Sequence, residues 1–215
     1  MPTTTDILTL SQWLSPAYPV GAFAYSHGLE WAIREGLVAD AVTLKSWLAG
    51  VLAEGSGRAD AVALAMAHRA TTTGEVCEVN RLARAFAASA ERIRESERQG
   101  AAFSATTRAV WGLDLPDLMY PVAVGRAAGL KGIEAEPTVA IYLQSFASNL
   151  VSAAVRLVPL GQTDGQTALA ALAPLCRRMA AEALDSGPDD LWSNAWASDI
   201  AAMKHETQQP RLFQS

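Results

Sequence analysis

The chain has 215 residues, 50% of them hydrophobic and 18% charged, with a formal net charge of -5. This length and composition predict one well-buried globular domain rather than a disordered chain, and the acidic balance offers no electrostatic footprint for nucleic acid or an anionic membrane. Cys77 and Cys176 are isolated and the first residues are polar, which argues against a disulfide framework, a structural zinc motif and a signal peptide and favours the reduced cytoplasm.

Apolar residues recur at helical spacing along the chain, and no segment convincingly predicts a β-strand. The first helix should end near Leu14, because the two prolines that follow disfavour helix in the residues before them. Further helices are expected over residues 26–36, 40–55, 59–70, 75–86, 90–110, 120–130, 137–157, 163–185 and 191–203, and Pro174 should kink or divide the one over 163–185 near Ala173. We therefore expect an all-α fold, a single-domain bundle of roughly eight to ten helices over residues 1–203, with a tail over residues 204–215.

The corner after the first helix, residues 15–30, reads S-P-A-Y-P-V-G-A-F-A-Y-S-H-G-L-E. Two prolines and a glycine make it irregular, and a helix should resume near Tyr25 or Ser26. Its apolar side chains, Phe23 and Tyr25 among them, should pack against neighbouring helices. Two interpretations remain: a buried corner between helices, or a recognition corner in which Tyr25 and His27 keep their polar ends on a surface or cavity.

The segment from Glu91 to Val110 starts with a dense run of charges and continues with small residues. Such a pattern is typical of a solvated helix face that becomes buried further along. The alternative is close packing of helices through Gly100 and Ala101 at a subunit interface.

Two later helices are rich in small or uncharged residues. Gly125 and Gly129 would let another helix approach closely, so we expect the helix over residues 120–130 to be central. The next helix is long and uncharged in its middle, but Gln144 and Asn149 interrupt it, which favours a buried helix over a membrane span. These two side chains must find partners or face a polar cavity.

The tail combines polar residues with an apolar pair, Leu212 and Phe213, beside Arg211. Pro210 cannot continue a helix. A frayed chain end would ordinarily lack such apolar residues, so we expect the tail to dock, either on its own domain or on a partner.

No enzyme or metal motif stands out. His27, His68 and His205 are not spaced as metal ligands, and no phosphate loop, dinucleotide fingerprint or nucleophile elbow is present. A triad drawn from Ser26, His27 and Glu30 would use near neighbours, and adjacent residues point to different faces of a helix. We expect no catalytic residue, no bound cofactor and no metal site.

The chain resembles the UreF family of urease accessory proteins along nearly its whole length, and three stretches carry the resemblance most clearly. Residues 19–30 match the family signature P-V-G-A-F-S-Y-S-H-G-L-E except that Ala24 replaces Ser. The tail is similar to the family pattern R-H-E-T-Q-Y-S-R-L-F-x-S, with Lys204 for Arg and Gln209-Pro210 for Tyr-Ser. Residues 120–125 are similar to H-P-V-A-x-G, with Tyr120 in the His position.

The resemblance implies an all-α, homodimeric, non-catalytic protein that helps deliver nickel into apo-urease. It would bridge the UreD (or UreH) scaffold and the UreG GTPase, and the GTPase would carry the nucleotide and the metal ligands. The tail is then expected to dock on the scaffold. The residues expected to bind partners are Tyr25, His27, Glu30, His205, Glu206, Gln208, Arg211, Leu212 and Phe213.

Two other functions stay open at this point. One is a direct nickel carrier that uses its histidines or cysteines. The other is a small helical hydrolase or lyase centred on His27.

Overall fold

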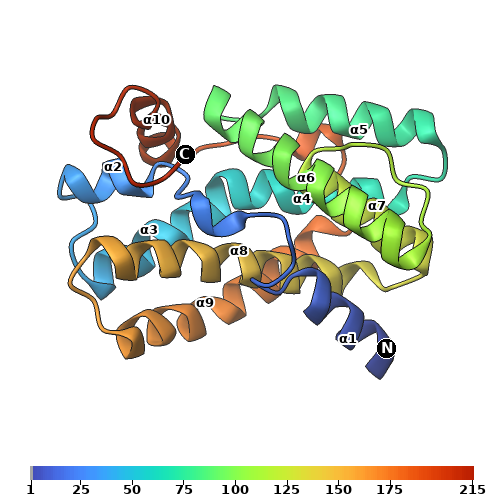
Figure 1. Cartoon of the computed structure of the whole chain (residues 1–215), viewed down its shortest axis with the longest axis horizontal. Coiled ribbons are helices and arrows are strands. Elements are labelled where there is room, and N and C mark those ends of the chain that lie inside the picture. Colours follow the sequence, from blue (N-terminus) through green and yellow to red (C-terminus); the bar gives the residue numbers. More distant parts are fainter. Residues whose placement is uncertain (1) are drawn as a thin grey trace.

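The computed structural model describes residues 2–215, which form ten α-helices, two short 3-10 turns and no strand (Figure 1). The predicted all-α fold is therefore confirmed. The helices are α1 (Thr4–Trp13), α2 (Leu29–Arg34), α3 (Ala41–Glu54), α4 (Ser56–Arg69), α5 (Thr73–Ala85), α6 (Ala90–Trp111), α7 (Tyr120–Lys131), α8 (Ala135–Leu157), α9 (Gln162–Ala183) and α10 (Trp196–His205). The 3-10 turns are Ala22–Ala24 and Pro188–Asp190.

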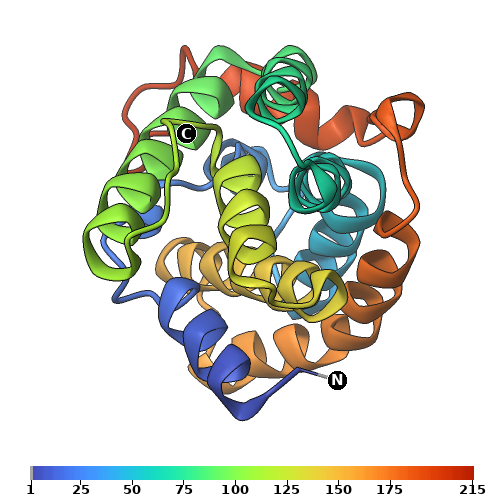
Figure 2. The ribbon, with the colours of Figure 1, turned by 90° about the vertical axis from the view of Figure 1, so that its right-hand side faces the viewer.

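Long helices that lie side by side form the body of the bundle. The helices α8 and α9 run antiparallel along one side of the long axis, and α3 packs on α9 (Figure 1). Seen from one end, α7 lies between α6 and α4 (Figure 2). The short helices α2 and α10 lie together at one end, whereas α1 lies toward the other (Figure 1). This arrangement puts residues from both halves of the chain at the α2–α10 end.

Small residues let α7 lie directly against α4, as the sequence predicts. A Cβ atom on Gly125 would lie 2.2 Å from the Leu64 carbonyl oxygen, and one on Gly129 would lie 2.5 Å from the His68 carbonyl oxygen. Both distances are far inside van der Waals contact, so no larger residue fits. The helix α7 is buried on this face and central in the bundle, since most of its residues have little or no exposure.

The helix α8 is, in residues 2–215, the one helix long and apolar enough to cross a membrane by length and composition. Half of its most apolar window is buried inside the bundle. A core helix passes the same test, so this is weak evidence for a span.

The corner between α1 and α2 is only partly as expected. Tyr25 and Ser26 are buried, but the Phe23 side chain is 68% exposed, so the expectation that it packs inside was wrong. The helix α2 begins at Leu29, later than predicted. His27 and Gly28 hold left-handed backbone conformations, with φ of 54° and 75°, and an α-helix cannot start through them.

Three other predictions need correction. The charged start of α6 is only partly solvated: Arg94, Glu97 and Arg98 are exposed, but the other charged face is buried, since Glu91, Arg92, Glu95 and Gln99 each expose less than a tenth of their surface. The helix α9 continues without a break through Pro174. The helix α10 begins five residues later than expected, at Trp196, and runs through His205, which the sequence had placed in the tail.

Candidate functional site

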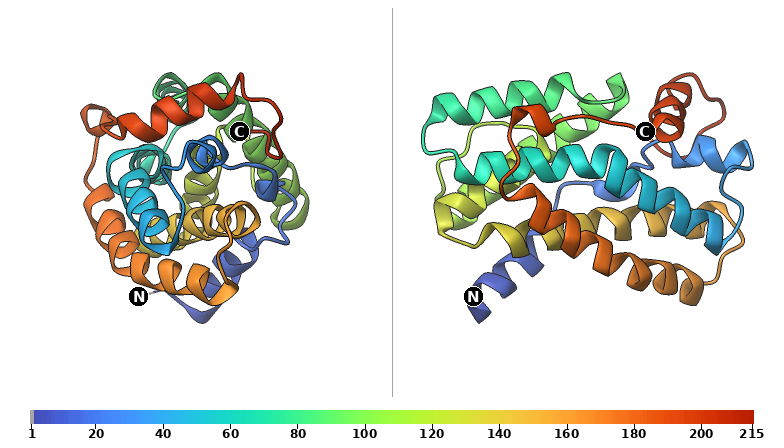
Figure 3. Two further views of the ribbon diagram at one scale, coloured as in Figure 1. Left: turned by 90° about the vertical axis from the view of Figure 1, so that its left-hand side faces the viewer. Right: turned by 180° about the vertical axis from the view of Figure 1, so that it is seen from behind.

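The corner and the tail, almost 190 residues apart, are joined by backbone hydrogen bonds at the α2–α10 end of the bundle. The Ser26 amide and hydroxyl both donate to the Ser215 carbonyl oxygen, at 2.7 and 2.5 Å. The Gln214 amide donates to the Ala24 carbonyl oxygen at 2.8 Å. Figure 3 shows the chain end beside this corner from behind. The two stretches that the sequence singled out therefore form one surface.

Glu30 holds the tail from the corner side. This carboxylate sits in the first turn of α2 and is 7% exposed. It accepts the backbone N–H of Leu212 at 2.7 Å and that of Phe213 at 2.9 Å. Hydrogen bonds to an ionised carboxylate are about twice as strong as neutral ones. Glu30 thus fixes the path of the tail through its backbone.

His205 lies between two carboxylates and is fully buried. Its Nδ1 atom is 2.8 Å from Glu91 Oε2, and its Nε2 atom is 3.2 Å from Glu30 Oε2. A neutral imidazole has one N–H, so only the doubly protonated ring donates to both carboxylates. His205 thereby connects α10 to α2 and α6.

Glu91 binds two further residues of the tail segment. Arg211 donates from Nη1 to Glu91 Oε1 at 2.5 Å. The backbone N–H of Glu91, in the first turn of α6, donates to Glu206 Oε1 at 3.2 Å. A negative side chain at this helix N-terminus is favourable, because the unpaired N–H groups there carry partial positive charge.

Glu95, one turn after Glu91, joins the tail to the corner. It accepts from His27 Nε2 at 2.8 Å and from Arg92 at 3.2 Å through Oε1, and from the Ser215 hydroxyl at 2.8 Å through Oε2. Burial by itself raises the pKa of Glu95, but His27 and Arg92 outweigh burial and lower the pKa to about 2. Glu95 is therefore an ionised acceptor inside the protein.

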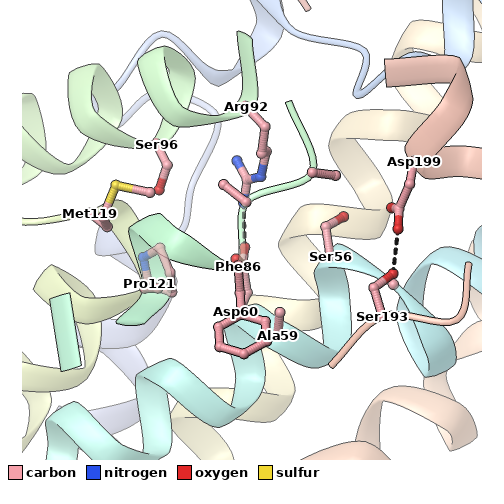
Figure 4. Close-up of a pocket in the computed structure, with 14 residues that line it drawn as sticks. Ser56, Ala59, Asp60, Phe86, Arg92, Ser96, Met119, Pro121, Ser193 and Asp199 are labelled. Atoms are coloured by element: carbon pink, nitrogen blue, oxygen red, sulfur yellow. Dashed lines mark hydrogen bonds and ion pairs between the residues drawn. The ribbon is translucent and has the colours of Figure 1, made fainter. Parts of the chain in front are cut away.

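Arg92 extends this network into the bundle. Figure 4 shows its guanidinium directed at Asp60 of α4, and the Nη2 to Oδ2 distance is 2.6 Å. The Tyr142 hydroxyl donates to the same Asp60 oxygen at 2.6 Å, and burial raises the pKa of Tyr142 well above its usual value. Arg92 thus lies between two carboxylates, Asp60 and Glu95, and leaves no uncompensated positive charge.

The backbone around His27 is set by close contact with α10. A Cβ atom on Gly28 would lie 2.4 Å from the Ala202 nitrogen, so the signature glycine is required by space as well as by its positive φ. The His27 ring packs edge-on against Phe146, with 4.7 Å between ring centroids.

The structure brings most of the predicted partner-binding residues to one place. Six of them meet at Glu30 or Glu91, namely Glu30, His205, Glu206, Arg211, Leu212 and Phe213, and His27 joins them through Glu95. Tyr25 is buried and its carbonyl oxygen accepts from Asn149, while Gln208 is buried and donates to the Pro210 carbonyl oxygen. The Leu212 side chain is 79% exposed, whereas that of Phe213 is buried.

Sequence reasoning missed the carboxylates of α6. A usable signal was present: Glu91, Glu95 and Gln99 recur every four residues, and Phe103, which is fully buried, continues the same row. Among residues 2–215 no group of three or more His, Cys, Asp or Glu side chains is placed to hold a metal ion. The arrangement is suited to hold a peptide segment through charge-assisted hydrogen bonds.

Comparison with known proteins gives consistent matches. The UreF family model matches residues 38–173. A protein of Cereibacter sphaeroides strain KD131 is 55% identical, over 97% of this chain and 98% of its own length. A protein of Roseobacter denitrificans is 53% identical, over 99% of this chain and 95% of its own length. A protein of Bradyrhizobium sp. strain ORS 278 is 46% identical, over 96% of this chain and 90% of its own length. All three are named urease accessory protein UreF.

Proposed function

Because the chain belongs to the UreF family of urease accessory proteins, we propose that it is a non-catalytic assembly factor that bridges the UreD (or UreH) scaffold and the UreG GTPase. In this role it helps insert nickel into apo-urease, without being the nickel carrier or the nucleotide-binding subunit. We further propose that it works as a homodimer in the cytoplasm.

The observation that carries this proposal is the joint surface of the corner and the tail. Arg156 connects the two: its guanidinium lies 4.5 Å from the centre of the Phe213 ring and donates to the Phe23 carbonyl oxygen at 3.0 Å. The side chains of Leu212 and Phe23 are 79% and 68% exposed. Exposed apolar side chains held on an ordered segment favour contact with another protein.

The charges beneath the tail explain why such a surface can be presented. Glu30 and Glu91 are buried, and without the tail they would lose most of their hydrogen-bond donors, which is costly for a charge. The tail is therefore held in place before a partner arrives. The partner then gains from burying Leu212, roughly 1.5–3 kcal/mol for complete burial, without the cost of ordering the tail.

On this proposal residues 204–215 form the scaffold-docking element of the domain. The corner around Tyr25 supports the surface that recruits the GTPase. Tyr25 itself is 6% exposed, so it would act by holding its neighbours in place.

The test is co-purification with UreD-type and UreG-type partners, followed by size-exclusion chromatography with light scattering. We compare the full chain with Leu212→Asp, which changes an exposed side chain of the tail, and Leu8→Asp, which changes one that is 65% exposed on α1. Leu212→Asp should weaken scaffold binding by at least tenfold with an unchanged thermal midpoint. Leu8→Asp should bind the scaffold as the unmodified chain does.

Two results would count against the proposal. Equal scaffold affinity for Leu212→Asp and the unmodified chain would remove the tail from the contact. Failure of the full chain to bind either partner would remove the bridging role itself.

A further inference from the structure

No further inference is drawn: the strongest candidate, the open apolar groove between α3 and α10 that Leu37, Trp47 and Trp196 line, carries none, because nothing in the structure shows what covers it.

Discussion

Two interfaces of this protein are held together by opposite means. The contact of α7 with α4 is made by Gly125 and Gly129 against main-chain carbonyls. The contact of the tail with α2 and α6 is made by the buried carboxylates Glu30, Glu91 and Glu95. Close main-chain packing dominates the first, beside the hydrogen bonds that Arg126 and His68 make with the Ala70 and Ile133 carbonyl oxygens, and we expect it to open only when the bundle unfolds. Charge-assisted hydrogen bonds hold the second, so we expect acid or a competing partner to loosen it while the bundle stays folded.

The largest expected effect comes from filling the α4–α7 contact. Gly125→Val places atoms where the Leu64 carbonyl oxygen lies, and a backbone carbonyl cannot move aside as a flexible side chain can. The free energy of unfolding should fall by about 3 kcal/mol, measured by urea denaturation. Gly50→Ala is the control, because nothing lies within 4 Å of its added Cβ atom. It should stabilise α3 by about 0.5–1 kcal/mol, and equal stability of the two variants would contradict the close contact.

The second-largest effect is expected at Glu95, through which the free energy of unfolding should depend on pH. Its pKa in the folded protein is lowered to about 2 from 4.5, because His27 and Arg92 outweigh the effect of burial. The stabilisation by ionised Glu95 is therefore complete above about pH 4.5 and is lost as the pH falls toward 2. It amounts to roughly 3 kcal/mol.

Urea denaturation from neutral to acidic pH, on the unmodified chain and on Glu95→Gln, measures this difference. The variant should be less stable at neutral pH, and the gap should close as the pH falls. Glu78→Gln is the control, since that carboxylate lies on the surface and pairs with Arg81 one turn away. A gap that is the same at every pH would show that Glu95 is not ionised in the fold.

The substitution Glu30→Gln should loosen the tail interface and leave the α4–α7 interface closed. It replaces a buried carboxylate that accepts hydrogen bonds from Leu212, Phe213 and His205. The free energy that holds the tail on the bundle should weaken by about 2 kcal/mol. Hydrogen exchange should become faster in residues 205–215 and stay unchanged in α4 and α7. Glu35→Gln, on the exposed end of the same helix, should leave both regions unchanged. An equal loss of protection in the tail and in α7 would mean that the two interfaces do not open separately.

The smallest effect is expected at Arg211. Its side chain is 43% exposed, so its pair with Glu91 is partly screened by solvent. Arg211→Ala should lower stability by about 0.5–1 kcal/mol at low salt and by less at high salt. Thermal unfolding at two salt concentrations measures this. Arg81→Ala, at a surface pair of α5, should change stability less, and a salt-independent loss at Arg211 would point to packing instead of charge.

Several features of the site could be read from the sequence and others could not. Resemblance singled out the corner and the tail, and family membership is confirmed by the comparisons. The contact between the two segments was not predicted. The charged start of α6 was interpreted as solvated because a dense run of charges usually forms a solvated helix face. Its partners His205 and Arg211 come from the other end of the chain, beyond the reach of local spacing.

The sequence by itself determined the all-α class, the position of most helices and the small-residue face of α7, because periodicity, caps and glycines act within a few residues of one another. Only the tertiary structure decided where the buried charges of α6 find their partners, how His27 is held, and that Phe23 faces solvent. These features depend on contacts between residues more than 30 positions apart. Burial also changes what a charge contributes to stability: a solvated carboxylate contributes little, whereas a buried one must be fully paired.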